Sequence, residues 1–319
     1  MGSLKRFALP IRLAVLIALM AYVGLVSRDT WNRISWDFFW QSPLVAMSLI
    51  AVGLNVLLPA GKYTWLYRRC GIPIAYRTAL ILEFATSSMS MLMPGKTENF
   101  VRAAVLGKRF GVPWRHSLVV SAYHLYTSIV ALLAAVMAWA GATKVFSPAT
   151  SGALTVAVLA SSMAPVWIAR RMTWGGLDLL RRLGVVDHIF ALLLSFALVA
   201  STPIFVLMIF AAHLIKATSA DVIFRSLLLD LLSQLPASIG GIGLRETGAL
   251  LLFRNFAPAS VLAATGLMVT LFEKLFAAAL GMPFAWGVLR ATGTGTHPVL
   301  SAQGDADGVS ASERLREKR

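Results

Sequence analysis

Arg245 and Glu246 follow a glycine-rich turn, and this combination of residue types could bind an anion. A glycine-rich turn that leads into a helix presents backbone N–H groups to a negative charge. Arginine adds a planar pair of donors that suits a phosphate. The alternative is structural: the glycines only let the chain turn, and Arg245 pairs with a neighbouring carboxylate. An arginine in such an apolar stretch is costly, which favours binding. The glycines are Gly240, Gly241 and Gly243.

A second group of charged residues follows Pro94 and Gly95, where another apolar stretch ends. Glu98 falls in the first turn of the predicted helix 96–107, where a negative charge is favourable. It also lies one turn before Arg102, so a plain salt bridge explains it equally well. Arg102 is the stronger candidate for binding because it matches the arginine of the glycine-rich turn. Lys96 is a third candidate cation.

Ionisable residues also interrupt other apolar segments. Glu273 and Lys274 lie near the middle of the last one, and adjacent helical positions point about 100° apart. We therefore expect each of them to meet a partner elsewhere, on one of the two broken segments. Further polar candidates, for which helix packing is an equal alternative, are Glu83, Asp230 and Gln234.

The sequence offers little support for catalysis or metal binding. His124 is more simply a packed or hydrogen-bonded residue than a base, and the histidines at 116, 188, 213 and 297 are expected in loops or the tail. Cys70 is the single cysteine. No Ser/His/Asp set, zinc-binding pattern or phosphate-binding loop motif is present. We therefore expect no catalytic residues, no metal and no cofactor.

The composition indicates the elements that must position these residues. Of the 319 residues, 58% are hydrophobic and 13% charged, with a mean hydropathy of +0.74. Soluble domains carry about 25% charged residues. The apolar runs are continuous rather than alternating, which favours helices over a β-barrel. We expect an all-α, polytopic helical membrane protein.

Six apolar stretches are long enough to span a bilayer. They cover residues 11–27, 44–60, 117–141, 150–169, 189–212 and 260–289. This assignment places Lys62 in a loop on the inner side.

Two shorter stretches, 78–93 and 226–235, are each followed by a break and a second short helix. If 78–93 crossed fully, the basic residues of 96–116 would lie outside, against the positive-inside rule. We therefore expect two re-entrant helical hairpins, the first entering from inside and the second from outside. Both termini are then cytoplasmic. The hairpin turns contain Pro94, Gly95, Pro236, Gly240, Gly241 and Gly243.

Opposed broken helices are typical of an inverted repeat around a site at the middle of the membrane. Both breaks share an apolar approach, a proline, a small or polar turn and then an arginine. We expect a membrane domain over residues 1–290. The composition of 291–319 predicts a disordered cytoplasmic tail.

The formal net charge is +15. Basic residues held in cytoplasmic loops explain this excess, and no aromatic and basic nucleic-acid module is visible. The expected partners are membrane lipids and not nucleic acid.

The segment Leu235-Pro-Ala-Ser-Ile-Gly-Gly-Ile-Gly-Leu-Arg-Glu246 resembles the signature of the lysylphosphatidylglycerol synthase transmembrane region, a flippase-like family. A weaker resemblance covers Met93–Ala103 and Leu106–Pro113. The resemblance extends over about residues 10–290. It implies a multi-pass protein of a bacterial or archaeal cytoplasmic membrane that handles lipids.

The first hypothesis is a translocator that moves an anionic, aminoacylated, polyprenyl- or hopanoid-type lipid between leaflets. Arg102, Arg245, Lys96 and Lys274 would hold the headgroup phosphate, while Glu83, Glu98, Glu246 and Glu273 would balance charge or gate the cavity. The alternatives are a membrane-embedded enzyme and an accessory partner of a lipid-biosynthetic enzyme. An enzyme is less expected, because the soluble aminoacyltransferase of two-domain family members is not in this sequence. The sequence is also compatible with a homo-oligomer.

Overall fold

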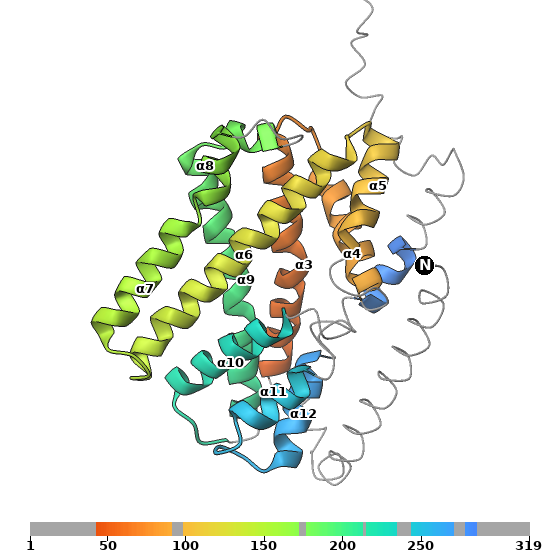
Figure 1. Cartoon of the computed structure of the whole chain (residues 1–319). Coiled ribbons are helices and arrows are strands. Elements are labelled where there is room, and N and C mark those ends of the chain that lie inside the picture. The colour runs from red at the N-terminus through yellow and green to blue at the C-terminus, as the bar shows by residue number, and fades with distance from the viewer. Residues whose placement is uncertain are drawn as a thin grey trace, which may run out of the picture.

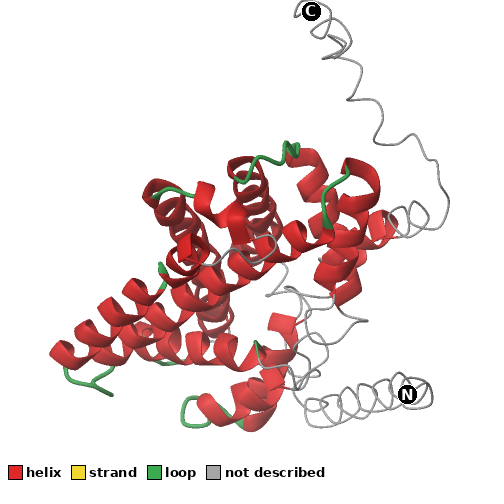
Figure 2. Cartoon of the chain, turned by 45° about the horizontal axis from the view of Figure 1, so that its top comes forward, coloured by secondary structure: helices red, strands yellow, loops and turns green. Residues whose placement is uncertain are grey.

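The computed structural model describes residues 43–90, 98–171, 177–212, 215–234, 244–270 and 278–285. In these ranges every regular element is a helix, as Figures 1 and 2 show. The expected all-α class is confirmed for this part of the chain. The expected first span at 11–27 and the tail at 291–319 lie outside the described residues.

Three long helices form the centre of the bundle. They are α3 (Pro43–Arg69), α6 (Trp114–Ala142) and α9 (Val185–Ala212). Beside them, α7 (Pro148–Ser161) and α8 (Ala164–Arg171) follow one another across a turn. By length and composition, three helical stretches in the described ranges could cross a membrane: 114–142, 148–171 and 185–211.

Two pairs of shorter helices lie at opposite ends of the long ones (Figure 1). The first pair is α4 (Tyr76–Ser90) and α5 (Glu98–Phe110), at the upper end in that view. The second pair, at the lower end, is α10 (Ser219–Ser233) and α11 (Leu244–Leu252). Both coincide with the broken segments expected from sequence. The remaining elements are the 3-10 helix η1 (Leu177–Arg182), α12 (Ala259–Thr270) and a helical segment at 278–285.

Local sequence explains where these helices begin and end. Gly71 and Gly111 adopt φ angles of 84° and 64° just after α3 and α5, a conformation that favours glycine. Ser147 caps α7 by accepting a hydrogen bond from the Thr150 N–H, and Pro148 follows at the first helical position. Thr218 caps α10 in the same way.

Small residues let the helices of the second pair approach closely. A Cβ atom added at Gly248 in α11 would lie 2.7 Å from Leu229 Cδ1 in α10. A Cβ atom at Gly266 in α12 would lie 2.8 Å from the Glu246 Cα. The Leu229 side chain could move aside for a larger residue, but the Glu246 backbone could not, so the contact at Gly266 requires glycine. Helix α11, which carries Arg245, is therefore packed between α10 and α12.

We expect Gly266→Ala to destabilise the protein by about 1–3 kcal/mol, because the added methyl group overpacks the contact with α11. Gly152→Ala in α7 is the matched control, since a Cβ atom there has no neighbour within 4 Å. It should be neutral or stabilising by up to about 1 kcal/mol. Unfolding in detergent, followed by intrinsic fluorescence, measures both variants. Equal stability of the two would contradict the close packing of α11 and α12.

Candidate functional site: a polar cavity between the two helix pairs

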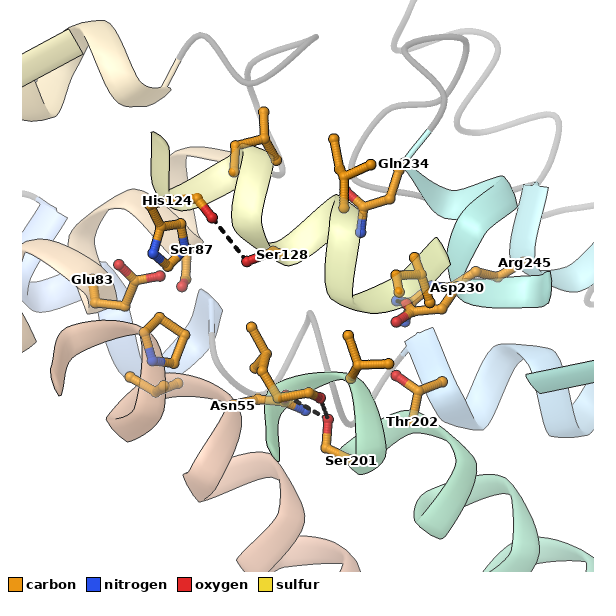
Figure 3. Close-up of a pocket in the computed structure, with 17 residues that line it drawn as sticks. Asn55, Glu83, Ser87, His124, Ser128, Ser201, Thr202, Asp230, Gln234 and Arg245 are labelled. Atoms are coloured by element: carbon orange, nitrogen blue, oxygen red, sulfur yellow. Dashed lines mark hydrogen bonds and ion pairs between the residues drawn. The ribbon is translucent and has the colours of Figure 1, made fainter. Parts of the chain in front are cut away.

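A cavity of about 210 Å³ lies between the two short helix pairs and the three long helices. Figure 3 shows Glu83, Ser87 and His124 on one side and Asp230, Gln234 and Arg245 on the other. Both pairs of broken helices thus contribute to one site. The remaining polar lining comes from Asn55, Ser128, Ser201 and Thr202.

The polar lining residues occur at helical spacing on several helices. Glu83 and Ser87 are one turn apart on α4, and His124 and Ser128 are one turn apart on α6. Asp230 and Gln234 repeat this spacing at the end of α10. Residues one turn apart lie on the same helix face, so each of these helices presents a polar stripe to the cavity.

The cavity lies at the level of a proline in two long helices. Pro59 stands inside α3 and Pro203 inside α9. A proline has no N–H to donate to the carbonyl group one turn earlier. Those carbonyl groups belong to Asn55 and Val199, which both line the cavity. At this level Ser201 Oγ donates to Asn55 Oδ1 over 2.7 Å and joins the two helices (Figure 3).

Arg102 lies behind Glu83, outside the cavity lining, and is 4% exposed. Its Nη2 donates to Glu83 Oε2 over 2.5 Å and to Thr86 Oγ1 over 2.8 Å. The guanidinium carbon lies 3.7 Å from the ring centre of Tyr63. Glu83, expected from sequence to balance charge, is therefore an ion-pair partner of Arg102. Nothing is described of the side chain of Glu98.

Arg245 lines the cavity directly and is 2% exposed. Its Nη2 lies 3.3 Å from Asp230 Oδ1. The structural alternative considered for Arg245, a pair with a neighbouring carboxylate, is present in the fold. Glu246 points elsewhere, and its Oε1 accepts a hydrogen bond from Thr270 Oγ1 over 2.8 Å.

The assignment of Lys62 to a loop is wrong. Helix α3 continues to Arg69, so Lys62 lies inside it, and its residue surface is 1% exposed. The expected span ended at residue 60 because charged residues follow, but packing against α9 and α6 buries this one. A signal was present: Asn55, Pro59 and Lys62 share one helix face.

His124 behaves as the packed residue that was expected. Its ring stacks on Tyr63 with 4.1 Å between centroids. His188, expected in a loop, lies instead in α9 and is 2% exposed. Its Nδ1 is 2.5 Å from the Tyr123 hydroxyl and its Nε2 is 2.7 Å from Ser162 Oγ. The helix begins earlier than its apolar run, which is why the sequence did not place His188 in it.

Several candidates from the sequence lie outside the described residues: Pro94, Gly95, Lys96, Pro236, Gly240, Gly241, Gly243, Glu273 and Lys274. In the part of the chain that the structure describes, no group of three or more His, Cys, Asp or Glu residues could hold a metal ion.

Residues 9–281 match the family described as the lysylphosphatidylglycerol synthase TM region. The chain belongs to this family of membrane proteins. The comparison with curated proteins and the comparison with solved structures gave no match. The resemblance found in the glycine-rich turn is thereby confirmed at the level of the family.

We expect Glu83→Gln to lower the free energy of unfolding by about 3 kcal/mol, since Arg102 stays buried while its counter-charge is lost. The double variant Glu83→Gln/Arg102→Gln should be more stable than the sum of the two single changes predicts. A denaturing-detergent titration of the four proteins measures this coupling. Additive effects would show that the pair is not coupled.

Proposed function

We propose that this protein moves membrane lipids between leaflets, with the headgroup passing through the cavity while the acyl chains stay in lipid. The observation that carries the proposal is that both broken helix pairs contribute charged residues to one polar cavity inside an apolar helical bundle. Membership of a family named for a lipid-modifying membrane protein supports a lipid-related role.

The charges of the cavity suit a headgroup that bears a phosphate. Arg245 faces the cavity, and a guanidinium binds a phosphate through two parallel hydrogen bonds. Its Nη2 lies 3.3 Å from Asp230 Oδ1, and an incoming phosphate would compete with this carboxylate for the guanidinium. On the other side of the cavity, Arg102 lies behind Glu83, and the two form an ion pair.

The same cavity also offers acceptors for a cationic group. Glu83 and Asp230 both line it, and a carboxylate accepts hydrogen bonds from an amine. A headgroup with a phosphate and an amine would therefore find both kinds of partner. Among the lipid classes considered from sequence, this mixture favours an aminoacylated or other amine-bearing phospholipid over a polyprenyl- or hopanoid-type lipid.

The re-entrant path of the two helix pairs is part of the proposal. The connections 70–75 and 111–113 lie at the same end of the bundle, while 143–147 and 215–218 lie at the other (Figure 1). The first pair therefore starts and ends at one end. The basic residues near that end include Arg68, Arg69, Arg170 and Arg171, which favours the cytoplasmic side. We further propose that the protein lies in a bacterial or archaeal inner membrane with both termini in the cytoplasm.

Cysteine accessibility tests this path. In a Cys70→Ala background, Pro73→Cys and Arg115→Cys should react with an impermeant maleimide from the same side of sealed vesicles. Val145→Cys should react only from the opposite side. The reason is that a re-entrant pair returns to its starting side, whereas a full crossing separates residues 73 and 115. Labelling of these two cysteines from opposite sides would rule out the re-entrant path of α4 and α5.

Lipid movement tests the function directly. In liposomes with fluorescent phosphatidylglycerol or phosphatidylethanolamine, the wild-type protein should speed leaflet exchange, measured by dithionite quenching. We expect Arg245→Gln to slow lipid exchange about tenfold, because the variant loses one charge-assisted hydrogen bond to the phosphate, which contributes about 1.5 kcal/mol. The matched control is Arg254→Gln, because Arg254 is exposed.

The proposal is wrong if Arg102→Gln and Arg245→Gln both leave exchange unchanged in well-folded protein. Mass spectrometry of the recovered lipids distinguishes the main alternative, since an embedded enzyme returns a chemically altered lipid and a translocator does not.

A further inference from the structure

Lys62 is a buried cation that the proposed lipid-binding site does not use. Its Nζ donates to Ser195 Oγ over 2.6 Å, to Ser128 Oγ over 3.0 Å and to the His124 carbonyl oxygen over 3.0 Å. The three hydrogen bonds match the three donors of an ammonium group. All three acceptors are neutral.

The arginines of the site are held differently. Arg102 and Arg245 each form an ion pair with a carboxylate. Among the residues that the structure describes, no carboxylate oxygen lies within 4.0 Å of the Lys62 ammonium. Charge buried among neutral groups is costly, and ionisable residues of this kind often mark proton pathways in membrane proteins. Lysine can release its proton in a protein interior, whereas arginine does not.

The ammonium group lies directly behind the cavity wall. Two of its partners, His124 and Ser128, line the cavity. The helices packed against α3 also carry titratable and charged groups. Tyr123 and His124 lie on α6, His188 lies on α9, and Glu83 lies on α4, where it pairs with Arg102 of α5. On α3 itself, the next residue, Tyr63, is titratable.

We propose that Lys62 is a proton-binding site, and that lipid movement is coupled to the uptake and release of a proton there. This inference rests on the proposed function. In the protonated form, the cavity wall gains a positive charge and holds the phosphate of the headgroup. Because Nζ lies behind the wall, its proton leaves through Ser128, which lines the cavity. The Ser128 hydroxyl oxygen takes the proton from Nζ while its own proton passes to a water molecule in the cavity, which becomes a hydronium ion. Serine is regenerated, and Nζ is left as a neutral amine. The headgroup is then held less tightly and can leave.

Two substitutions fix the two charge states. Lys62→Arg keeps the positive charge but cannot release it, and Lys62→Met removes it. The assay uses liposomes that contain fluorescent phosphatidylglycerol, with pyranine trapped inside to report the internal pH. When a pH gradient is imposed, the rate of lipid exchange by the wild-type protein should change severalfold. Both variants should lose this response. Lys62→Arg should still bind the lipid, while Lys62→Met should bind it about tenfold more weakly. Lys216→Met is the matched control, because Lys216 is exposed.

A third variant covers the case in which both substitutions at Lys62 prevent folding. Ser195→Ala keeps the lysine and removes its shortest hydrogen bond. It should shift the pH midpoint of lipid exchange downward, because the ammonium form loses an acceptor. Pyranine should also report proton movement when lipid is added to wild-type vesicles but not to Lys62→Arg vesicles.

Wild-type exchange that is independent of pH and of the gradient would overturn the proton site while leaving the translocator intact. So would a wild-type response in Lys62→Arg and Lys62→Met, or an unchanged midpoint in Ser195→Ala. Absence of any lipid exchange by the wild-type protein would overturn the proposed function, and the proton site with it.

Discussion

A cation buried in an apolar helical bundle is stable only where other polar groups satisfy it, and this constraint organises the centre of the molecule. Lys62, Arg102 and Arg245 are all buried. Each is satisfied by side chains or carbonyl oxygens from a different segment of the chain. Those contacts join α3 to α9, α4 to α5 and α10 to α11. The polar groups around the cavity therefore also hold its walls together.

The two arginines and the lysine contribute to the cavity in different ways. An arginine keeps its charge, so the ion pairs of Arg102 and Arg245 provide permanent polarity on the two sides of the cavity. Their carboxylate partners keep the net charge of each pair near zero. Lys62 sits among hydroxyl and carbonyl groups, which can remain in place whichever charge the amine carries. The permanent charges of Arg102 and Arg245 and the proton that we propose for Lys62 thus lie in different parts of one site.

The lipid movement that we propose would require the walls of the cavity to change shape, and two of the long helices lack a backbone hydrogen bond at that level. The prolines of α3 and α9 each remove one helical hydrogen bond at the level of the cavity. The glycine contacts of α11 and α12 have the opposite character, since they fix Arg245 closely against its neighbours. Positions without a helical hydrogen bond thus lie on two long helices at the cavity, and tightly packed positions lie beside Arg245.

The sequence alone determined the helical class, the two broken helix pairs and the arginines that distinguish them, because hydropathy, prolines and glycines act over a few residues. It also indicated Glu83, Asp230 and Gln234 as polar candidates. Only the tertiary structure decided that Glu83 pairs with Arg102, that Lys62 is buried and that His188 lies in a helix. The reason is physical. Helical spacing fixes which residues share a face, but the register between helices fixes which faces meet, and that depends on packing between residues far apart in the chain.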